Sequence, residues 1–334
     1  MSAADASAST SSDPENGAPH EEADAVAYLG PEGTFTHQAV LTWAARDARP
    51  VRPTPVSSVG AVHDAVACGG SAAGVVAIES SVEGYVVPSL DALVGSEDVV
   101  AVDEVVLDVS FDAFVLSGHG ELREATAHPH GLAQCSRFVA ERGLQPVAAS
   151  SNAAACRDIA PHQVALGPSL CGDLYGLTTL ATAVEDFHGA RTRFLVLRRR
   201  ELAPELLREP RRSGDAWRTM LAITPLVTGP GVLARVTAAF GVRRVNMSSL
   251  VSRPLKAQEG QYVFVVTLDA APWAPEVREL FSDLLAAGDS LKVLGVYQAE
   301  PGEGGLDGVL PDHVPVGSVG QGDDASTIAR GLLW

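Results

Sequence analysis

An unbroken apolar run at residues 73–78 limits most strongly how this chain can fold. Six consecutive apolar positions suit a strand that is buried on both faces, because a half-buried strand alternates polar and apolar residues. Other short apolar segments predict strands at 25–29, 99–109, 113–116, 164–166 and 194–197, and helices are predicted after Thr34, His128 and Ser151 and at 171–175. Strands that alternate with helices predict an α/β fold with mostly parallel sheets.

A second pattern follows a charged stretch. Residues 201–216 are predicted to be a linker, since glutamates interleave with the arginines there. Beyond it, residues 217–298 show the order strand, helix, strand, strand, helix, strand, with strands at 219–225, 245–252, 262–268 and 292–296 and helices at 232–240 and 275–286. This order predicts a small ferredoxin-like domain.

The two ends of the chain differ from its middle. Residues 1–24 carry six acids and no large apolar residue, so we expect them to be disordered. Residues 299–334 carry six acids and one arginine, and we expect a flexible acidic tail. These ends hold most of the formal net charge of −17.

The overall composition excludes several classes of partner. A net charge of −17 argues against nucleic acid and anionic membranes as partners, since both need clustered Lys and Arg. No apolar run is long enough to span a bilayer, and the N-terminus has no secretory signal pattern. The four cysteines are widely spaced, and neither a metal site nor a disulfide framework is predicted. We therefore expect a cytoplasmic protein.

Three motifs in the first 200 residues could carry chemistry. YLGPEGTFTHQ (28–38) joins a strand to a helix and could hold an anion, or could be a plain turn. VVAIESSVEGYVVPSLDAL (75–93) places Glu79 directly after the buried strand, where a cleft residue and a capping residue are both plausible. GARTRFLVL (189–197) places Thr192 and Arg193 at the mouth of another strand, although threonine is also a common strand residue.

Taken together and in this order, the motifs resemble the prephenate dehydratase family over residues 25–298. The segments HPHGLAQC (128–135), SNAAA (151–155), ALGPSLCGDLYGL (165–177) and TRFLVL (192–197) also match. The small domain resembles an ACT regulatory module, because residues 228–254 are similar to the effector segments of that family. We place the catalytic domain at 25–200 and the ACT domain at 217–298.

The resemblance implies a two-subdomain, periplasmic-binding-protein-like catalytic domain with a cleft, followed by the ferredoxin-like ACT domain. It also implies a reaction without metal or cofactor, in which prephenate loses CO2 and water and becomes phenylpyruvate for phenylalanine biosynthesis. The family's catalytic threonine corresponds to Thr192, which would donate a hydrogen bond to the leaving hydroxyl. The other implied catalytic residues are Glu79 and Gln134. The implied substrate-binding residues are Thr34, Phe35, Ser80, Ser81, Arg193 and Phe194. Arg193 would either hold a substrate carboxylate or lock the subdomain interface, and the locking role is slightly favoured.

The ACT resemblance implies regulation by L-phenylalanine and a homodimer or homotetramer, since the edge of a four-stranded sheet needs covering. The implied effector residues are Gly231, Val232, Leu233, Asn246, Ser252, Arg253 and Pro254. Val251 stands where the family has glutamate, so a weakened response to phenylalanine is expected.

Other departures from the family pattern keep two further hypotheses open. Ser80 stands where the family has an asparagine, and the family's asparagine just before Thr-Arg-Phe falls on Gly189 or Ala190. Ala127 also removes a hydroxyl that often precedes the His-Pro pair, and Ala77 replaces a proline. Losing donors near the leaving hydroxyl favours a decarboxylase that keeps the ring hydroxyl. A catalytically weak sensor of small acids or aromatic amino acids is the third hypothesis.

Overall fold

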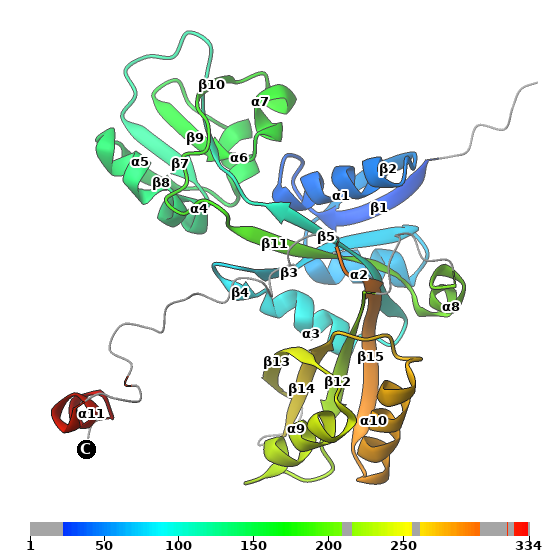
Figure 1. Cartoon of the computed structure of the whole chain (residues 1–334). Helices are drawn as coiled ribbons and strands as arrows, with labels where there is room; N and C mark the ends of the chain where they lie inside the picture. Colours follow the sequence, from blue (N-terminus) through cyan, green and yellow to red (C-terminus); the bar gives the residue numbers. More distant parts are fainter. Residues whose placement is uncertain (1–22, 209–215, 256–260, 301–318, 320–323, 333–334) are drawn as a thin grey trace, which may run out of the picture.

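The computed structural model describes residues 23–208, 216–255, 261–300, 319 and 324–332, and it has three bodies (Figure 1). The first body is built around the predicted strand at 73–78, which is buried on both faces. Its elements are β1 (Asp24–Leu29), α1 (Phe35–Arg46), β2 (Val51–Val56), α2 (Val59–Ala67), β3 (Ala73–Ser80), β4 (Gly84–Tyr85), α3 (Val87–Gly95), β5 (Val99–Asp108), β11 (Arg191–Arg199), the 3-10 turn η1 (Arg200–Leu202) and α8 (Ala203–Leu206). We call it the first subdomain.

The second body is inserted between β5 and β11, and we call it the second subdomain. Its sheet has the order β10-β6-β9-β7-β8. The chain enters it after Asp108 and leaves it before Arg191, and the two crossings are joined by a hydrogen bond from Val109 N to Ala190 O of 2.7 Å. Its elements are β6 (Asp112–Val115), β7 (Glu124–Ala127), α4 (Pro129–Gln134), α5 (Ser136–Glu141), β8 (Gln145–Ala148), α6 (Asn152–Arg157), β9 (Gln163–Gly167), α7 (Leu170–Tyr175) and β10 (Thr178–Ala181).

The α/β prediction with two subdomains is confirmed, but the prediction of mostly parallel sheets is wrong. In the first subdomain β1 pairs with β2 and β3 in parallel, whereas β11 is antiparallel to both β3 and β5. In the second subdomain β7 is parallel to β8 and β9, and β6 is antiparallel to β9 and β10. The physical reason is the insertion: a strand that returns from the second body enters the first sheet from the opposite end.

The third body, which we call the C-terminal unit, has the predicted βαββαβ order. Two helices cover one face of its sheet, whose strand order is β13-β14-β12-β15. Its elements are β12 (Trp217–Thr224), α9 (Val232–Arg243), β13 (Met247–Pro254), β14 (Tyr262–Leu268), α10 (Pro275–Ala286) and β15 (Ser290–Gln298).

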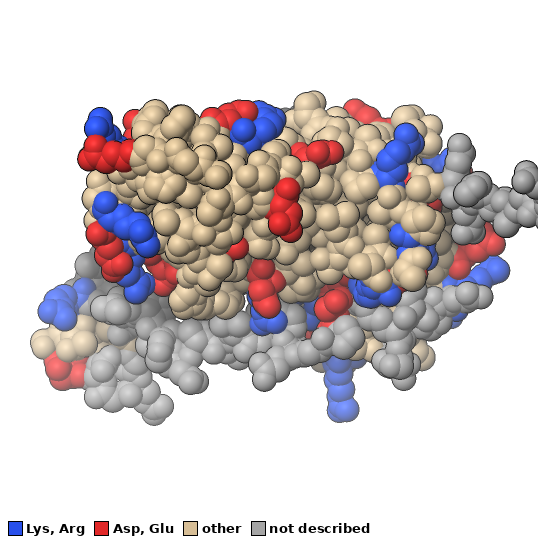
Figure 2. Space-filling model, turned by 90° about the horizontal axis from the view of Figure 1, so that it is seen from above, with Lys and Arg blue, Asp and Glu red and all other residues tan. Residues whose placement is uncertain are grey.

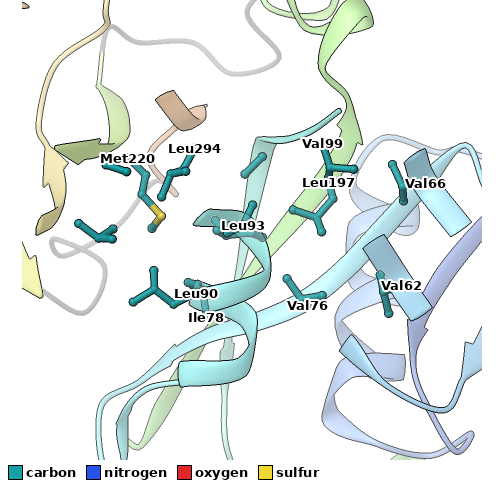
Figure 3. Close-up of a cluster of buried hydrophobic side chains, with 14 of the residues drawn as sticks. Val62, Val66, Val76, Ile78, Leu90, Leu93, Val99, Leu197, Met220 and Leu294 are labelled. Atoms are coloured by element: carbon teal, nitrogen blue, oxygen red, sulfur yellow. The ribbon is translucent and has the colours of Figure 1, made fainter. Parts of the chain in front are cut away.

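The C-terminal unit and the first subdomain form one continuous sheet. Strand β15 pairs with β5 in parallel at Gly295 and Ala101. A side chain at Gly295 would place its Cβ 2.8 Å from the Ala101 Cβ, so the close approach of these strands requires glycine. One apolar core crosses the junction, and Figure 3 shows Leu90 and Leu93 of α3 facing Met220 and Leu294 of the C-terminal unit.

The predicted linker and ends are described only in part. The linker's first residues, 201–206, form the end of η1 and helix α8, in which Ala203 packs against Val100 and Val102 of β5. Residues 209–215 and the N-terminal segment 1–22 lie outside the described residues. In the acidic tail, α11 (Ala325–Leu332) is a helix.

The surface and the helices carry two further observations. Figure 2 shows a face on which acidic and basic side chains are interspersed. Within the described part of the chain, no helix has the length and apolarity needed to cross a membrane.

Candidate active site

A cavity of about 490 Å³ lies between the two subdomains. Both subdomains and the two crossings contribute to its walls. The lining residues are Phe35, Thr36, Ala77, Ser80, Glu83, Gly84, Tyr85, Val86, Val87, Pro88, Val109, Phe111, His130, Gly131, Gln134, Asn152, Ala190, Thr192 and Phe194. A second cavity of about 460 Å³ shares Phe35, Thr36 and Asn152 with it and extends to Thr34 and His128.

Strand β11 carries Thr192 to this cavity. Thr192 pairs with Ser80 of β3 and Leu107 of β5, so its backbone is fixed on both sides. Because side chains alternate along a strand, Thr192 and Phe194 face the cavity while Arg193 points to the opposite face. The register of the pairing between β11 and β3 shifts between Arg193 and Phe194. Because of this shift, the residues of β3 that line the cavity are Ala77 and Ser80.

Arg193 is therefore not in the cavity wall, and the expected contact with substrate does not fit its position. It is only 1% exposed, and its guanidinium pairs with Glu79 at 3.2 Å and Glu104 at 3.4 Å. Glu104 also pairs with Arg218 of the C-terminal unit at 3.3 Å. Arg193 thus joins β3, β5 and the C-terminal unit, which corresponds to a locking role, although at a different junction from the predicted one.

Glu79 and Ser81 also lie outside the cavity lining. Glu79 and Arg193 are opposite each other in the β3–β11 ladder, and their side chains form an ion pair. This pair lies on the face of the sheet opposite to the Thr192 side chain. The Ser81 hydroxyl accepts a hydrogen bond of 2.9 Å from Arg191 N, and Ser81 N donates one of 2.8 Å to Arg191 O. Both residues hold the strand end that presents Thr192.

The turn before α1 forms another part of the wall. Thr34 is the N-cap of α1, and its hydroxyl accepts from His37 N at 3.2 Å. Phe35 contacts Phe111 edge-on at 5.3 Å between ring centroids and so bridges the subdomains. His37 Nδ1 accepts from Gly33 N at 3.1 Å, and burial lowers the pKa of His37.

Two polar contacts tie this turn to the second subdomain. The Cys171 thiol donates to Gly33 O at 3.3 Å, and the Tyr175 hydroxyl donates to Glu32 O at 2.7 Å.

Helix α4 supplies the polar groups of the opposite wall. Gln134 lies in the lining, and its amide donates to Glu83 at 3.4 Å. His130 Nδ1 lies 3.6 Å from another oxygen of Glu83. Glu83 comes from the first subdomain, so its carboxylate links the two walls of the cavity. It contacts Gln134 and His130, the two groups that could otherwise bind a carboxylate of a ligand.

The motifs did not single out several lining residues as site residues. Asn152 was interpreted only as a helix start, yet its side chain accepts from His128 N at 2.9 Å and lines both cavities. Its signal was the SNAAA segment. His130 was likewise visible within HPHGLAQC. Glu83 and Tyr85 lie within the motif at 75–93 but were not singled out, because the β3–β4 hairpin that brings them to the cavity was not predicted.

The predicted effector residues fall into two groups. Gly231, Val232 and Leu233 begin α9, near the end of β13 that carries Ser252. Asn246 precedes β13 and lies at the other end of the unit, where its amide donates to Asp269. The strand register shows this separation, since Met247 and Thr219 both pair with Leu268 while Ser252 and Ile223 both pair with Phe264.

Arg253 and Pro254 complete the predicted effector set. The Arg253 guanidinium forms a two-point ion pair with Asp91 of α3, at 3.0 and 3.1 Å. Pro254, the last residue of β13, pairs with Tyr262.

A cleft between two α/β subdomains, joined to a βαββαβ unit, is the architecture of a ligand-binding protein with an attached accessory unit. The model of the family "Prephenate dehydratase" matches residues 26–202. A prephenate dehydratase of Amycolatopsis methanolica is 32% identical over 281 residues, covering 83% of this chain and 89% of that protein. The chain belongs to the prephenate dehydratase family.

Solved structures show the same similarity. The prephenate dehydratase of Arthrobacter aurescens in complex with L-Phe has a TM-score of 0.71 at 28% identity, covering 82% of this chain and 90% of that one. GqqA, described as a novel type of quorum quenching acylase, has a TM-score of 0.72 at 25% identity, covering 83% and 98%. The fold is therefore shared by proteins of different described activities, and the site must decide the chemistry.

Proposed function

We propose that the chain converts prephenate to phenylpyruvate, CO2 and water in the cavity between its subdomains. The observation that carries the proposal is the position of Thr192, whose side chain enters a wall that also contains Phe35, Phe111 and Phe194. A hydroxyl donor beside three aromatic side chains suits a reaction that turns a six-membered ring aromatic. Family membership supports the same reaction.

The chemistry requires two bonds of the substrate to break. The electron pair of the carboxylate C–C bond enters the ring, CO2 leaves, and the ring hydroxyl departs with its electron pair and takes up a proton from solvent to become water. Thr192 is a neutral donor, so it stabilises the charge on the departing hydroxide instead of acting as a strong acid. The apolar walls favour loss of the carboxylate because they remove water from it.

The side chains of the opposite wall hold the substrate. Gln134, Asn152 and Ser80 offer neutral donors, and His130 offers a donor that can carry positive charge. The carboxylates of prephenate take the groups that Glu83 otherwise occupies. Glu79 and Arg193 act from behind β11, where their ion pair keeps Thr192 in place.

Regulation by L-phenylalanine is the second part of the proposal. The L-Phe complex of the relative from Arthrobacter aurescens supports it. In one chain Asn246 lies at the opposite end of the unit from Gly231, so we assign the effector site to a junction between two copies of the C-terminal unit. Strand β13 is at the end of the described sheet order, and pairing of two copies there would cover that edge. The expected assembly remains a homodimer or homotetramer.

One assay tests the proposed activity against its alternatives. The full-length protein is incubated with prephenate, and both phenylpyruvate and CO2 are quantified. The proposal expects equal amounts of the two products. CO2 without phenylpyruvate would identify a decarboxylase that keeps the ring hydroxyl. Neither product, together with thermal stabilisation by L-phenylalanine, would identify a sensor.

A further inference from the structure

Helix α3 touches both the cavity and the C-terminal unit. Val87 and Pro88, in its first turn, line the cavity together with the preceding Val86. Leu90 and Leu93, further along the helix, are 0% exposed and belong to the core that includes residues of β12 and β14 (Figure 3). One short helix therefore forms a wall of the cavity with its first turn and is packed against the C-terminal unit with the rest.

Three polar contacts, which we call the links, attach α3 and the two residues before it, Tyr85 and Val86, to the C-terminal unit. The Tyr85 hydroxyl donates to the Ser249 hydroxyl of β13 at 2.6 Å. Asp91 forms its two-point ion pair with Arg253 of the same strand. At the other end, the Lys292 ammonium donates to Val94 O at 2.7 Å, which satisfies a carbonyl of the last helical turn.

The start of α3 is held by Pro88 in its first turn and by a backbone hydrogen bond from Val86 N to Ile78 O of 2.9 Å, but by no capping side chain. Its N-cap is Val86. Tyr85, two residues before the helix, is itself part of the cavity wall, so its hydrogen bond to Ser249 joins that wall directly to β13. Tyr85 also pairs with Glu79 in the β3–β4 ladder, and Glu79 pairs with Arg193 beside Thr192.

We propose that α3 is the element through which the C-terminal unit sets the shape of the cavity, with Tyr85 and Asp91 as positioning residues. The inference rests on the proposed function, because it assigns a consequence to ligand binding at the C-terminal unit. Ser249 and Arg253 flank Val251 and Ser252 on β13. A ligand that moves this strand therefore changes two contacts that hold the cavity wall.

The test compares full-length variants that each remove one link without altering the cavity lining. Ser249→Ala removes the hydroxyl that accepts from Tyr85 and also donates to Thr267 of β14 at 3.1 Å. Asp91→Asn removes the ion pair with Arg253. Asp283→Asn is the matched control, because Asp283 forms a similar two-point pair with Arg243, at 2.6 and 3.0 Å, entirely within the C-terminal unit. For each protein we would measure kcat and KM for prephenate with and without L-phenylalanine, the binding of L-phenylalanine by calorimetry, and hydrogen exchange of residues 84–92.

The expected result is a KM raised at least about threefold in Ser249→Ala and Asp91→Asn, with kcat changed less, since a looser wall weakens binding. Their exchange at residues 84–92 is faster, and they bind L-phenylalanine normally but respond to it less than the wild type. Asp283→Asn behaves as the wild type in every measurement. Wild-type KM and wild-type exchange in both link variants would overturn the inference.

The failure of the proposed function gives a different result. A wild-type protein that does not turn over prephenate contradicts the proposed activity. The role of α3 is then tested only by comparing the hydrogen exchange of residues 84–92 in the variants and the wild type. A wild type that turns over prephenate but ignores L-phenylalanine contradicts the effector part, and KM and exchange decide. In each case unchanged values in both link variants count against α3, and changed values support it.

Discussion

The first subdomain meets its two neighbours in different ways. Its junction with the second subdomain contains the cavity, two chain crossings and isolated polar contacts such as Tyr175 with Glu32. Its junction with the C-terminal unit contains a shared sheet, a shared apolar core and the buried Glu104 between two arginines. The junction with the second subdomain, which we call the open junction, leaves room for a ligand. The junction with the C-terminal unit, which we call the filled junction, is closely packed, so a movement of the C-terminal unit also moves the first subdomain, because packed interfaces resist continuous deformation.

The largest expected effect concerns the open junction and its donor. Thr192→Val keeps the shape of the side chain but removes the hydroxyl, and we expect a loss of turnover of about 10²–10³-fold. Thr192→Ser keeps a hydroxyl and should retain much of the activity. Phenylpyruvate formation measures both. Wild-type turnover in the valine variant would show that the cavity does not use Thr192.

The filled junction should lose stability when its buried charge is removed. Glu104 is 0% exposed and pairs with Arg193 and Arg218. Glu104→Gln leaves two buried guanidinium groups without that charge, which costs about 3–5 kcal/mol of unfolding free energy. Denaturant titration measures it. Glu121→Gln, which affects an exposed pair with Arg123, is the control and should leave the midpoint unchanged. Equal midpoints for the two variants would contradict the account of this junction.

A smaller effect is expected at the mouth of the open junction. Glu83→Gln removes the carboxylate that faces His130 and Gln134, so the substrate no longer competes with it. Exposed ion pairs contribute about 0.2–1 kcal/mol, which corresponds to a KM lowered by up to about fivefold. Steady-state kinetics should show kcat nearly unchanged. A raised KM would mean that Glu83 helps to bind the substrate instead.

The smallest effect is a pH dependence at the turn before α1. Burial lowers the pKa of His37 below its ordinary value of 6.5, and the Glu32 charge opposes this shift only in part. The folded state therefore binds fewer protons than the unfolded state, so this contribution to stability is present above about pH 6.5 and is lost as the pH falls toward the folded pKa.

Thermal unfolding between pH 7 and 5 tests that dependence. His37→Gln should reduce the loss of stability on acidification, although His63 and His128, whose pKa values burial also lowers, contribute part of it. If the stability of the variant and of the wild type fell equally with decreasing pH, His37 would not contribute to the pH dependence.

The sequence allowed most of the fold to be predicted, because long apolar strands and capped helices leave local signals. Helix α3 and strand β8 were not predicted, and the local reason differs between them. Helix α3 lacks a capping side chain, and β8 is largely exposed and has no apolar run. The single-sheet junction could not be predicted, since it depends on Gly295 meeting Ala101, nearly two hundred residues earlier.

The candidate site was predictable where a motif carried it. Thr192, Gln134 and Phe35, which the motifs single out, line the cavity, and their roles stay predictions. Arg193 and Arg253 were expected to bind ligands, but their partners Glu104 and Asp91 come from distant segments that no local pattern connects to them. A motif identifies a residue, whereas burial and pairing decide which ligands its side chain can reach.

The most direct test of the central claim is a crystal structure of the full-length protein with phenylpyruvate bound. The account predicts phenylpyruvate in the cavity between the subdomains, with its ring between Phe35 and Phe194 and the Thr192 hydroxyl facing it. Phenylpyruvate found only elsewhere, for example in the cavity of about 690 Å³ lined by Trp217 and Trp273, would contradict the account.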